Sequence, residues 1–191
     1  MSAVRSSSCA PVSEHRPVTT PVAAFPPIVG PAPRVLVLGS LPGVRSLAVG
    51  EYYAHPRNAF WPIMGALVGA SPALDYAGRV AALQRGRIAL WDVLQRAVRP
   101  GSADTAIELA GAVVNPFGEF LGQHRSIRAI AFNGGAAARL YRRLVLPALP
   151  PRLAELPQLL LPSTSPAYAS LDLRAKERRW SELQSLLRLA R

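Results

Sequence analysis

The densest group of side chains that could do chemistry lies in residues 51–64, EYYAHPRNAFWPIM. It places aromatic rings among basic and amide groups, an arrangement suited to stacking on a nucleobase beside a phosphate. Structural explanations remain open, because Asn58 could cap the start of a helix, and Phe60 and Trp61 could be core residues. His55 stands before a proline, where a hydrogen-bonded structural role is the alternative to a catalytic one.

Two loops could supply backbone and hydroxyl donors. GSLPGVRS (39–46) contains glycines, so its exposed backbone N–H groups could meet a phosphate or a carbonyl, although a tight turn also explains the glycines. It matches neither the P-loop nor the dinucleotide-binding pattern. PSTSPAYAS (162–170) sets small hydroxyl side chains between prolines, which suits contact with a DNA backbone and equally suits an ordinary proline-rich turn.

The sequence lacks the residue patterns that a metal site, an internal disulfide or a serine hydrolase would need. The single cysteine, Cys9, forms no internal disulfide, and no Cys/His cluster has zinc-site spacing, so we expect neither a metal nor a cofactor. No GxSxG elbow is present, and of the three histidines only His55 lies near one of these segments. An unrelated α/β hydrolase is therefore a weak alternative.

The charge balance points to a polyanionic partner. The chain of 191 residues has 22 basic and 11 acidic residues, a formal net charge of +11. Genome composition could explain part of this arginine excess, but its size favours binding to DNA or RNA. No run of about 18 apolar residues predicts a membrane span, and the start of the chain lacks the apolar core of a signal peptide, so we expect a cytoplasmic protein.

The elements that must position these segments can be read from the hydrophobic pattern. Four short apolar runs, typical of buried strands, alternate with helical patterns, which predicts an α/β layered domain with a mainly parallel sheet. The expected strands cover 34–40, 87–94, 126–135 and 156–166, and the expected helices cover 71–84, 115–124, 136–146 and 172–190. Sites in such sheets form outside the carboxyl ends of the strands, where GSLPG, DVLQRAVRPGS, FNGG and PSTSPA fall.

The beginning of the chain differs from the rest in composition. Residues 1–33 hold seven of the 19 prolines, with serine, threonine and alanine filling most of the remainder. This composition predicts a disordered or loosely attached arm, followed by an ordered domain over 34–191. Deletion of residues 1–30 is therefore expected to leave stability nearly unchanged.

Taken together, the motifs resemble a known family. The segments that carry the resemblance are VLGSLPGVRSL (37–47), YYAHPRNAFWPIM (52–64), WDVL (91–94) with GSADTAI (101–107), FNG (132–134) and LPSTSPA (161–167). Their order resembles the uracil-DNA glycosylase superfamily, and most closely its sixth family, the hypoxanthine-DNA or DNA-deoxyinosine glycosylases. The resemblance implies a three-layer α/β/α sandwich around a central four-stranded, mainly parallel sheet.

The resemblance also implies an activity. A monofunctional enzyme of this kind hydrolyses the N-glycosidic bond of a deaminated base, hypoxanthine and/or uracil, that is flipped out of DNA, and leaves an abasic site. It works as a monomer on double- or single-stranded DNA without an obligate protein partner. The residues do not choose among hypoxanthine, uracil and xanthine, and a non-catalytic nucleic-acid-binding module of the same fold remains the alternative.

The family's functional residues map onto particular positions of this chain. GSLPG lacks the acidic or amide residue that orients water in most of the superfamily, and the catalytic asparagine of the sixth family maps to Asn58. Two positions depart from the wider pattern. Leu161 stands where several families place a base-contacting histidine or asparagine, and Tyr168 stands where an asparagine is expected.

The remaining site residues fall into two expected groups. The base would meet the backbone of the GSLPG loop, an aromatic ring and an amide, and the DNA backbone would meet basic and hydroxyl side chains. The expected base-binding residues are Leu41, Pro42, Gly43, Tyr53 or Phe60, and Asn133; the expected DNA-binding residues are His55, Arg57, Ser163, Thr164 and Ser165.

The only lysine bears on whether the enzyme also cuts the strand. A lyase step needs an amine that forms a Schiff base with the sugar. Lys176 lies among charged residues in LRAKERRW, which predicts a solvated helix face away from the site. We therefore expect a monofunctional glycosylase.

Overall fold

Four apolar segments form the parallel sheet at the centre of the protein. In the computed structural model, which describes residues 20–188, the strands run in the order β3-β2-β6-β7. They are β2 (Val35–Gly39), β3 (Ile88–Asp92), β6 (Ala129–Asn133) and β7 (Gln158–Leu161). Every residue of β2 and β3 is buried, as expected for strands covered on both faces. All four predicted strands are confirmed, and every pair among them is parallel.

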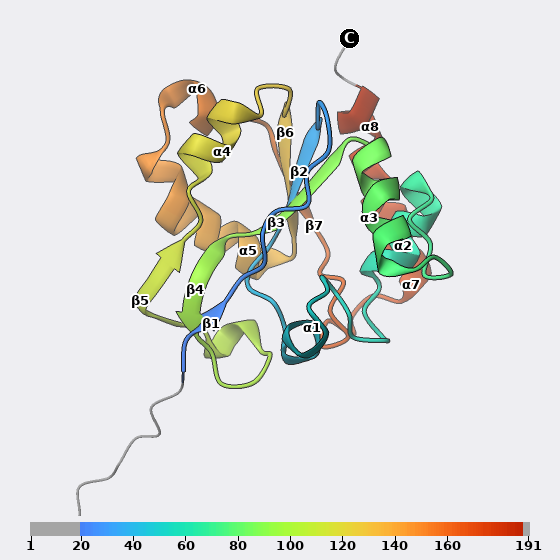
Figure 1. The fold of residues 1–191 in the computed structure, drawn as a ribbon, viewed down its shortest axis with the longest axis horizontal. Helices are drawn as coiled ribbons and strands as arrows, with labels where there is room; N and C mark the ends of the chain where they lie inside the picture. Colours follow the sequence, from blue (N-terminus) through green and yellow to red (C-terminus); the bar gives the residue numbers. More distant parts are fainter. Residues whose placement is uncertain (1–19, 189–191) are drawn as a thin grey trace, which may run out of the picture.

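Helices cover both faces of this sheet (Figure 1). One face carries α2 (Phe60–Val68), α3 (Tyr76–Arg85), α7 (Leu173–Trp180) and α8 (Glu182–Arg188). The other carries α4 (Phe117–Gln123), α5 (Gly135–Leu140) and α6 (Pro151–Ala154). A short helix, α1 (Val44–Val49), lies below the sheet in this view. The arrangement confirms the predicted three-layer α/β/α sandwich.

The alternation of side chains along β2 creates the two halves of the core. Leu36 and Leu38 join a cluster with α4 and α5, whereas Val35 and Val37 join a cluster with α2, α3, α7 and α8. Successive side chains of a strand point to opposite faces, so one five-residue strand contributes to both clusters. The strand ends are thereby fixed from both sides.

A second, antiparallel sheet was not predicted. It contains β1 (Val22–Ala23), β4 (Leu94–Val98) and β5 (Glu108–Val114) in the order β1-β4-β5. Only Val93 separates β3 from β4, so the apolar pattern indicated one strand where the chain forms two. A 3₁₀ turn over Asp104–Ala106 precedes β5.

The predicted helices are present, but some of their ends differ. The first begins at Tyr76, where Asp75 accepts a hydrogen bond from the Gly78 N–H, while Ser71 forms a local turn instead. The helix after β6 continues into a π-helical turn over Tyr141–Val145. The last predicted helix is broken at Ser181 into α7 and α8. No helix among residues 20–188 has the length and apolar character needed to cross a membrane.

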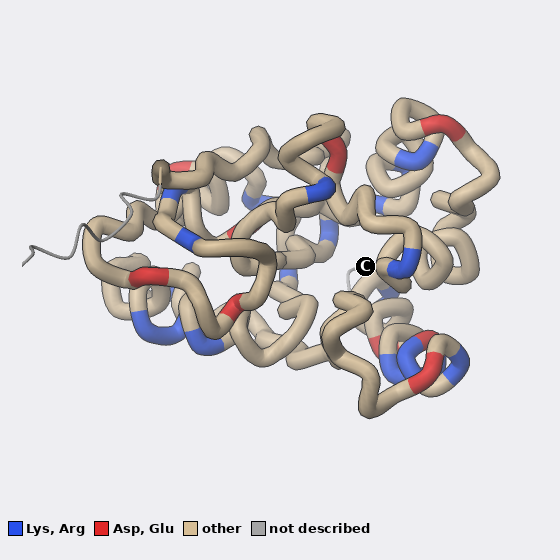
Figure 2. Tube along the Cα trace, turned by 90° about the horizontal axis from the view of Figure 1, so that it is seen from below, with Lys and Arg blue, Asp and Glu red and all other residues tan. Residues whose placement is uncertain are grey.

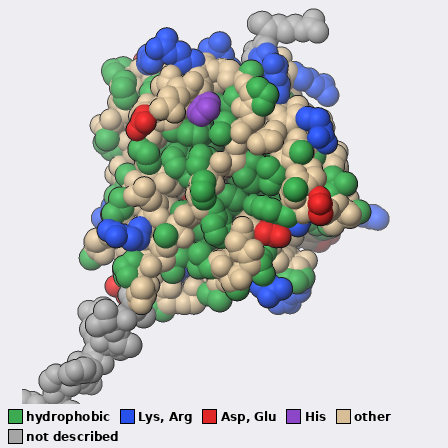
Figure 3. Space-filling view, in the orientation of Figure 1, with side chains coloured by type: hydrophobic (Ala, Val, Ile, Leu, Met, Phe, Trp, Pro, Cys, Tyr) green, Lys and Arg blue, Asp and Glu red, His purple; other side chains and the backbone are tan. Residues whose placement is uncertain are grey.

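Residues 20–33 contact the domain, contrary to the expectation of a loose arm up to residue 33. Ile28 is buried and exchanges two backbone hydrogen bonds with Leu90 of β3, an edge strand of the parallel sheet. The Phe25 carbonyl accepts hydrogen bonds from the Trp91 indole and the Tyr52 hydroxyl. Hydrophobic side chains fill the middle of the face that this segment crosses (Figure 3). Residues 1–19, including Cys9, lie outside the described residues.

Deletion of residues 1–30 should therefore lower the melting temperature, in contrast to the expectation from composition. Loss of a buried isoleucine and two ladder hydrogen bonds costs about 2–3 kcal/mol, which corresponds to a decrease of about 5–10 °C for a domain of this size. Calorimetry on chains lacking residues 1–19 and residues 1–30 isolates the contribution of the described segment. Equal melting temperatures for the two truncations would contradict the prediction.

Candidate active site

A cavity opens at the carboxyl edge of the parallel sheet, beside α1. Its volume is about 160 Å³, similar to the roughly 150 Å³ cavity that accommodates benzene in another protein. The lining comes from the ends of β2, β3 and β6, from the segment 99–104 between β4 and β5, and from the three loops that the sequence singled out: residues 39–46, 52–58 and 163–166. The three loops therefore lie together at the carboxyl edge of the sheet, as predicted.

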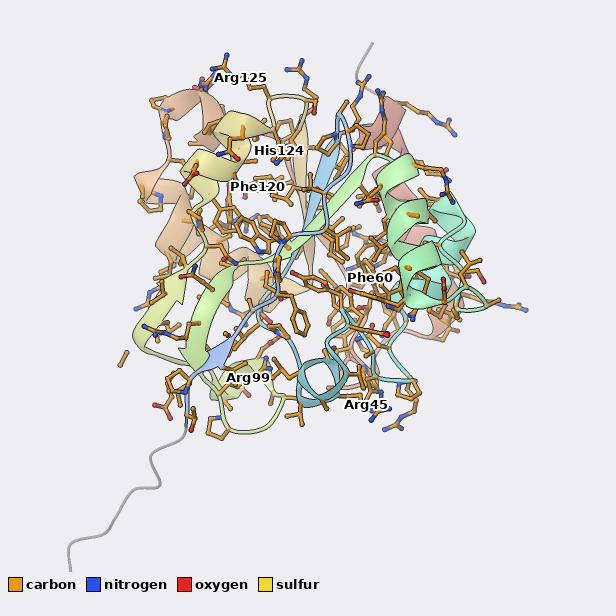
Figure 4. The ribbon with its side chains drawn as sticks, viewed as in Figure 1. Arg45, Phe60, Arg99, Phe120, His124 and Arg125 are labelled. Carbon is orange, nitrogen blue, oxygen red and sulfur yellow. The ribbon has the colours of Figure 1, made fainter. Side chains whose placement is uncertain are left out.

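The GSLPG loop is fixed by a buried arginine. Arg99 donates hydrogen bonds to the carbonyl oxygens of Leu41, at 3.1 Å, and Pro42. Asp104 lies 3.8 Å from the same guanidinium and accepts a 2.5 Å hydrogen bond from the Ser40 hydroxyl. Arg99 thus binds the loop from the side of β4, as its position in Figure 4 shows. Leu41, Pro42 and Gly43 line the cavity through this fixed backbone.

Asn58 both caps a helix and lines the cavity. Its Oδ1 accepts a 3.0 Å hydrogen bond from the Phe60 N–H at the start of α2, so the capping interpretation is correct as far as it goes. Its Nδ2 has no hydrogen-bond partner among the described residues, although the residue borders the cavity. The side chain is therefore oriented by its oxygen while its amide nitrogen remains available.

Asn133 and Thr164 form two hydrogen bonds with each other. The Asn133 Nδ2 donates to the Thr164 hydroxyl and the Thr164 N–H donates to the Asn133 Oδ1, both at 2.8 Å. The Thr164 carbonyl also accepts a hydrogen bond from the Ala59 N–H at 3.0 Å. Thr164 is only 1% exposed, so its side chain cannot grip a phosphate as expected. The pair instead joins β6, the 163–166 loop and the start of α2.

Of the two aromatic candidates, only Tyr53 lines the cavity. Phe60 is fully buried, and its ring stacks on Tyr53 with centroids 4.1 Å apart. The expectation that Phe60 could meet a base is therefore wrong; it supports the ring that can. Tyr53 has a φ of +53°, an uncommon conformation for a residue with a side chain, which tends to persist where function requires it.

The expected DNA-binding side chains surround the mouth unevenly. His55 lines the cavity, and its Nδ1 accepts a hydrogen bond from the Arg57 N–H. The Arg57 side chain is exposed and stands outside the lining. The hydroxyl oxygens of Ser163 and Ser165 accept backbone N–H groups within their own loop, which leaves their O–H groups to donate.

Lys176 is not on a solvated face. It is buried on α7, and its Nζ donates to the carbonyl oxygens of Tyr168, at 2.8 Å, and Ser165, at 3.4 Å. Trp180, one turn further along α7, donates to the Pro162 carbonyl at 2.9 Å. Burial lowers the pKa of the Lys176 amine. The helix thus holds the 162–168 loop in place, contrary to the sequence-based expectation.

Asp92 received no role from the sequence, although WDVL was among the matching segments. It is 3% exposed at the end of β3 and lines the cavity. Burial raises the pKa of its carboxyl to about 7, with Asp104 adding to the rise and Arg99 opposing it. The sequence feature that could have identified Asp92 is its position as a charged residue at the end of an apolar run. No cluster of metal-binding side chains exists among residues 20–188.

Comparison with known proteins shows the family of the chain. Residues 26–184 match the family model of the Uracil DNA glycosylase superfamily, and the chain belongs to this superfamily. It is similar to a hypoxanthine DNA glycosylase of Methanosarcina barkeri (strain Fusaro / DSM 804), with 36% identity over 111 residues, covering 58% of this chain and 69% of the relative. A hypoxanthine DNA glycosylase of Methanosarcina acetivorans is 33% identical over 114 residues, covering 59% and 71%.

A solved structure gives the same answer for the fold. The solution NMR structure of a candidate uracil DNA glycosylase from Methanosarcina acetivorans superposes with a TM-score of 0.73 at 29% identity. The match covers 88% of this chain and 99% of that protein. The resemblance deduced from the motifs is therefore confirmed.

Proposed function

We propose that the protein is a DNA glycosylase that removes a deaminated base, hypoxanthine or uracil, from DNA and leaves an abasic site. The observation that carries the proposal is the cavity at the carboxyl edge of the sheet, lined by three loops that fall within the residues matched to the superfamily, 26–184. Its volume of about 160 Å³ is on the scale of a single base, and the glycosidic bond is accessible only when the base leaves the stack. The two relatives named as hypoxanthine DNA glycosylases support this substrate class.

The mechanism needs positioning and electrostatics more than a strong nucleophile. As the bond breaks, positive charge develops on the sugar and negative charge on the departing base. We assign the positioning of water to Asn58, which borders the cavity with a free amide nitrogen and an oriented side chain. Tyr53 offers its ring to the base, and the backbone of the 41–43 segment contacts the base edge. No cofactor enters the proposal.

The DNA backbone is proposed to cross the mouth of the cavity. Lys and Arg positions are spread over the trace and interspersed with acidic ones, as Figure 2 shows from the side on which α1 lies. The net charge therefore does not by itself locate the DNA. Arg45 is exposed on α1 and lines the cavity, whereas Arg125 lies at the opposite end of the protein (Figure 4).

Arg45→Glu should weaken DNA binding, whereas the matched Arg125→Glu should not. Loss of one phosphate contact reduces the magnitude of the slope of log K against log salt by about 1, from the roughly −4 to −5 expected for four to six contacts. Fluorescence anisotropy with an abasic duplex at several salt concentrations measures both quantities. A larger effect from Arg125→Glu would move the DNA to the other end of the protein.

Excision assays test the proposal itself. Duplexes and single strands that carry one hypoxanthine, uracil or xanthine are incubated with the protein and then treated with alkali. Alkali-dependent breaks at the lesion, absent from an undamaged duplex, are expected for hypoxanthine or uracil. A protein that binds these strands and releases no base is the non-catalytic module, which would contradict the proposal.

Strand cutting without alkali is not expected. The Lys176 amine is the only lysine amine of the chain, donates to two carbonyl groups and does not line the cavity, so it is poorly placed to attack the sugar. Borohydride added during excision should trap no covalent adduct. An adduct that is present in the wild-type protein and lost in Lys176→Arg would show that the lysine reaches the sugar.

A further inference from the structure

Asp92 places an unpaired carboxyl oxygen at the part of the cavity lining formed by Gly39, Tyr53 and Asp92, which we call the inner end. Its Oδ2 is buried and has no hydrogen-bond partner among the described residues. Arg99, whose charge acts on this carboxyl, donates its hydrogen bonds to loop carbonyl groups instead. Buried polar atoms are nearly always paired, so an orphaned carboxyl beside a cavity calls for a ligand group as its partner.

The absence of a side chain at Gly39 leaves space for the Asp92 carboxyl and for a second unpaired polar group, the Tyr53 hydroxyl. A Cβ at position 39 would collide with the Asp92 Oδ1 and would lie 2.8 Å from the Tyr53 hydroxyl. The Tyr53 hydroxyl is also buried without a hydrogen-bond partner. The Asp92 carboxyl and the Tyr53 hydroxyl therefore both lie against Gly39, each with a buried oxygen that has no hydrogen-bond partner among the described residues.

The surroundings of Asp92 favour its neutral form. The charged and titratable side chains that face it are Arg99, Asp104, Tyr52 and Tyr53. Burial is the largest influence and raises the pKa of Asp92 to about 7, against the opposing effect of Arg99. Below that pH the group carries an O–H and can donate a hydrogen bond, as a buried neutral carboxylic acid does in another enzyme.

We propose that Asp92 is a further catalytic residue, which donates a hydrogen bond from its neutral carboxyl to the departing base. The inference rests on the proposed glycosylase function. When the C1′–N bond breaks, its electron pair moves into the base, and the negative charge spreads to the lactam oxygen. An O–H donor stabilises that charge, whereas a carboxylate would repel it. The water oxygen bonds to C1′, solvent supplies a proton to the base and takes one from the water, and Asp92 keeps its own.

The position of the carboxyl separates this role from that of a general base. A base that activates water must be ionised and must face C1′, which stays near the DNA backbone at the mouth. Asp92 is only 3% exposed at the end of β3 and packs against Gly39. We therefore place the edge of the base, and not C1′, beside it. The two roles have opposite pH dependence: a donor loses activity as the pH rises through its pKa, whereas a base gains activity.

Single-turnover excision of uracil from pH 5.5 to 9, with wild type, Asp92→Asn and Asp92→Leu, tests the proposal. The wild-type rate should fall above about pH 7, the Asn variant should keep a rate within about tenfold of wild type with a flat profile, and the Leu variant should lose roughly 100-fold. A wild-type rate that rises with pH, or an inactive Asn variant, would overturn the donor role.

A second substrate keeps the test decisive if the Leu variant is unstable. The fluorine of 5-fluorouracil stabilises the departing anion, so the ratio of wild-type to Asn rates at pH 9 should move closer to one than it does for uracil. Equal ratios for the two bases would contradict leaving-group stabilisation. Failure of the wild-type protein to release any base would refute the proposed function. Excision at the same rate by wild type and by both Asp92 variants would instead refute only the role of Asp92.

Discussion

Asn58→Ala should lower the single-turnover rate of base excision about 10²–10³-fold and leave lesion-DNA binding largely intact. The expectation follows from the site: the GSLPG loop offers no acidic or amide side chain, and Asn58 borders the cavity with an amide nitrogen that no residue in 20–188 engages. Quenched-flow or manual single-turnover assays with an excess of enzyme measure the chemical step directly.

The capping hydrogen bond requires a matched variant. Alanine removes the acceptor for the Phe60 N–H, which costs about 1 kcal/mol of stability. Asn58→Ser retains a good capping oxygen but lacks the amide nitrogen. If the serine variant is as stable as wild type and still loses excision, the Asn58 amide contributes to catalysis. If the serine variant excises at nearly the wild-type rate, the role of Asn58 is limited to capping α2.

Gly39→Ala should abolish most activity through the inner end of the cavity. The added methyl group collides with Asp92 and crowds the Tyr53 hydroxyl, so both must move. Displacement of a site by about 1 Å can cost 10²-fold in rate, and overpacking costs about 1–3 kcal/mol of stability. Rates and denaturant midpoints of the same preparation measure both effects.

Gly118→Ala is the control for that substitution. Gly118 lies in α4, and a Cβ there meets nothing within 4 Å, so alanine should leave both activity and stability close to wild type. A Gly39→Ala protein with normal excision would show that the inner end of the cavity does not receive the base.

The hydrophobic pattern was sufficient for the parallel sheet because its strands are buried on both faces. Runs such as VLVLG have no alternation to confuse with a surface strand. The antiparallel sheet was missed because β4 carries exposed Gln95 and Arg96 and adjoins β3 almost without a break. Residues 20–33 were misjudged because proline content does not reveal that Ile28 pairs with the edge of β3.

The candidate site was predictable as a set of loops but not as a set of contacts. The order of strands brings the three motifs to one edge, as expected from the carboxyl-end rule. Nothing local in the sequence shows that Asn133 pairs with Thr164, or that Arg99 binds the Leu41 carbonyl, because the partners are 31 and 58 residues apart. The burial of Lys176 likewise depends on the carbonyl groups of a loop that only the folded chain places beside it.

The most direct measurement for the central claim is a crystal structure with a duplex that carries 2′-fluoro-2′-deoxyinosine, whose glycosidic bond resists hydrolysis. We expect the hypoxanthine ring to leave the stack and occupy the cavity at the carboxyl edge of the sheet. There it should lie against Tyr53, with its edge toward Asp92 and its sugar beside Asn58. A base that stays stacked in the duplex, or DNA that binds at the end marked by Arg125, would contradict the account.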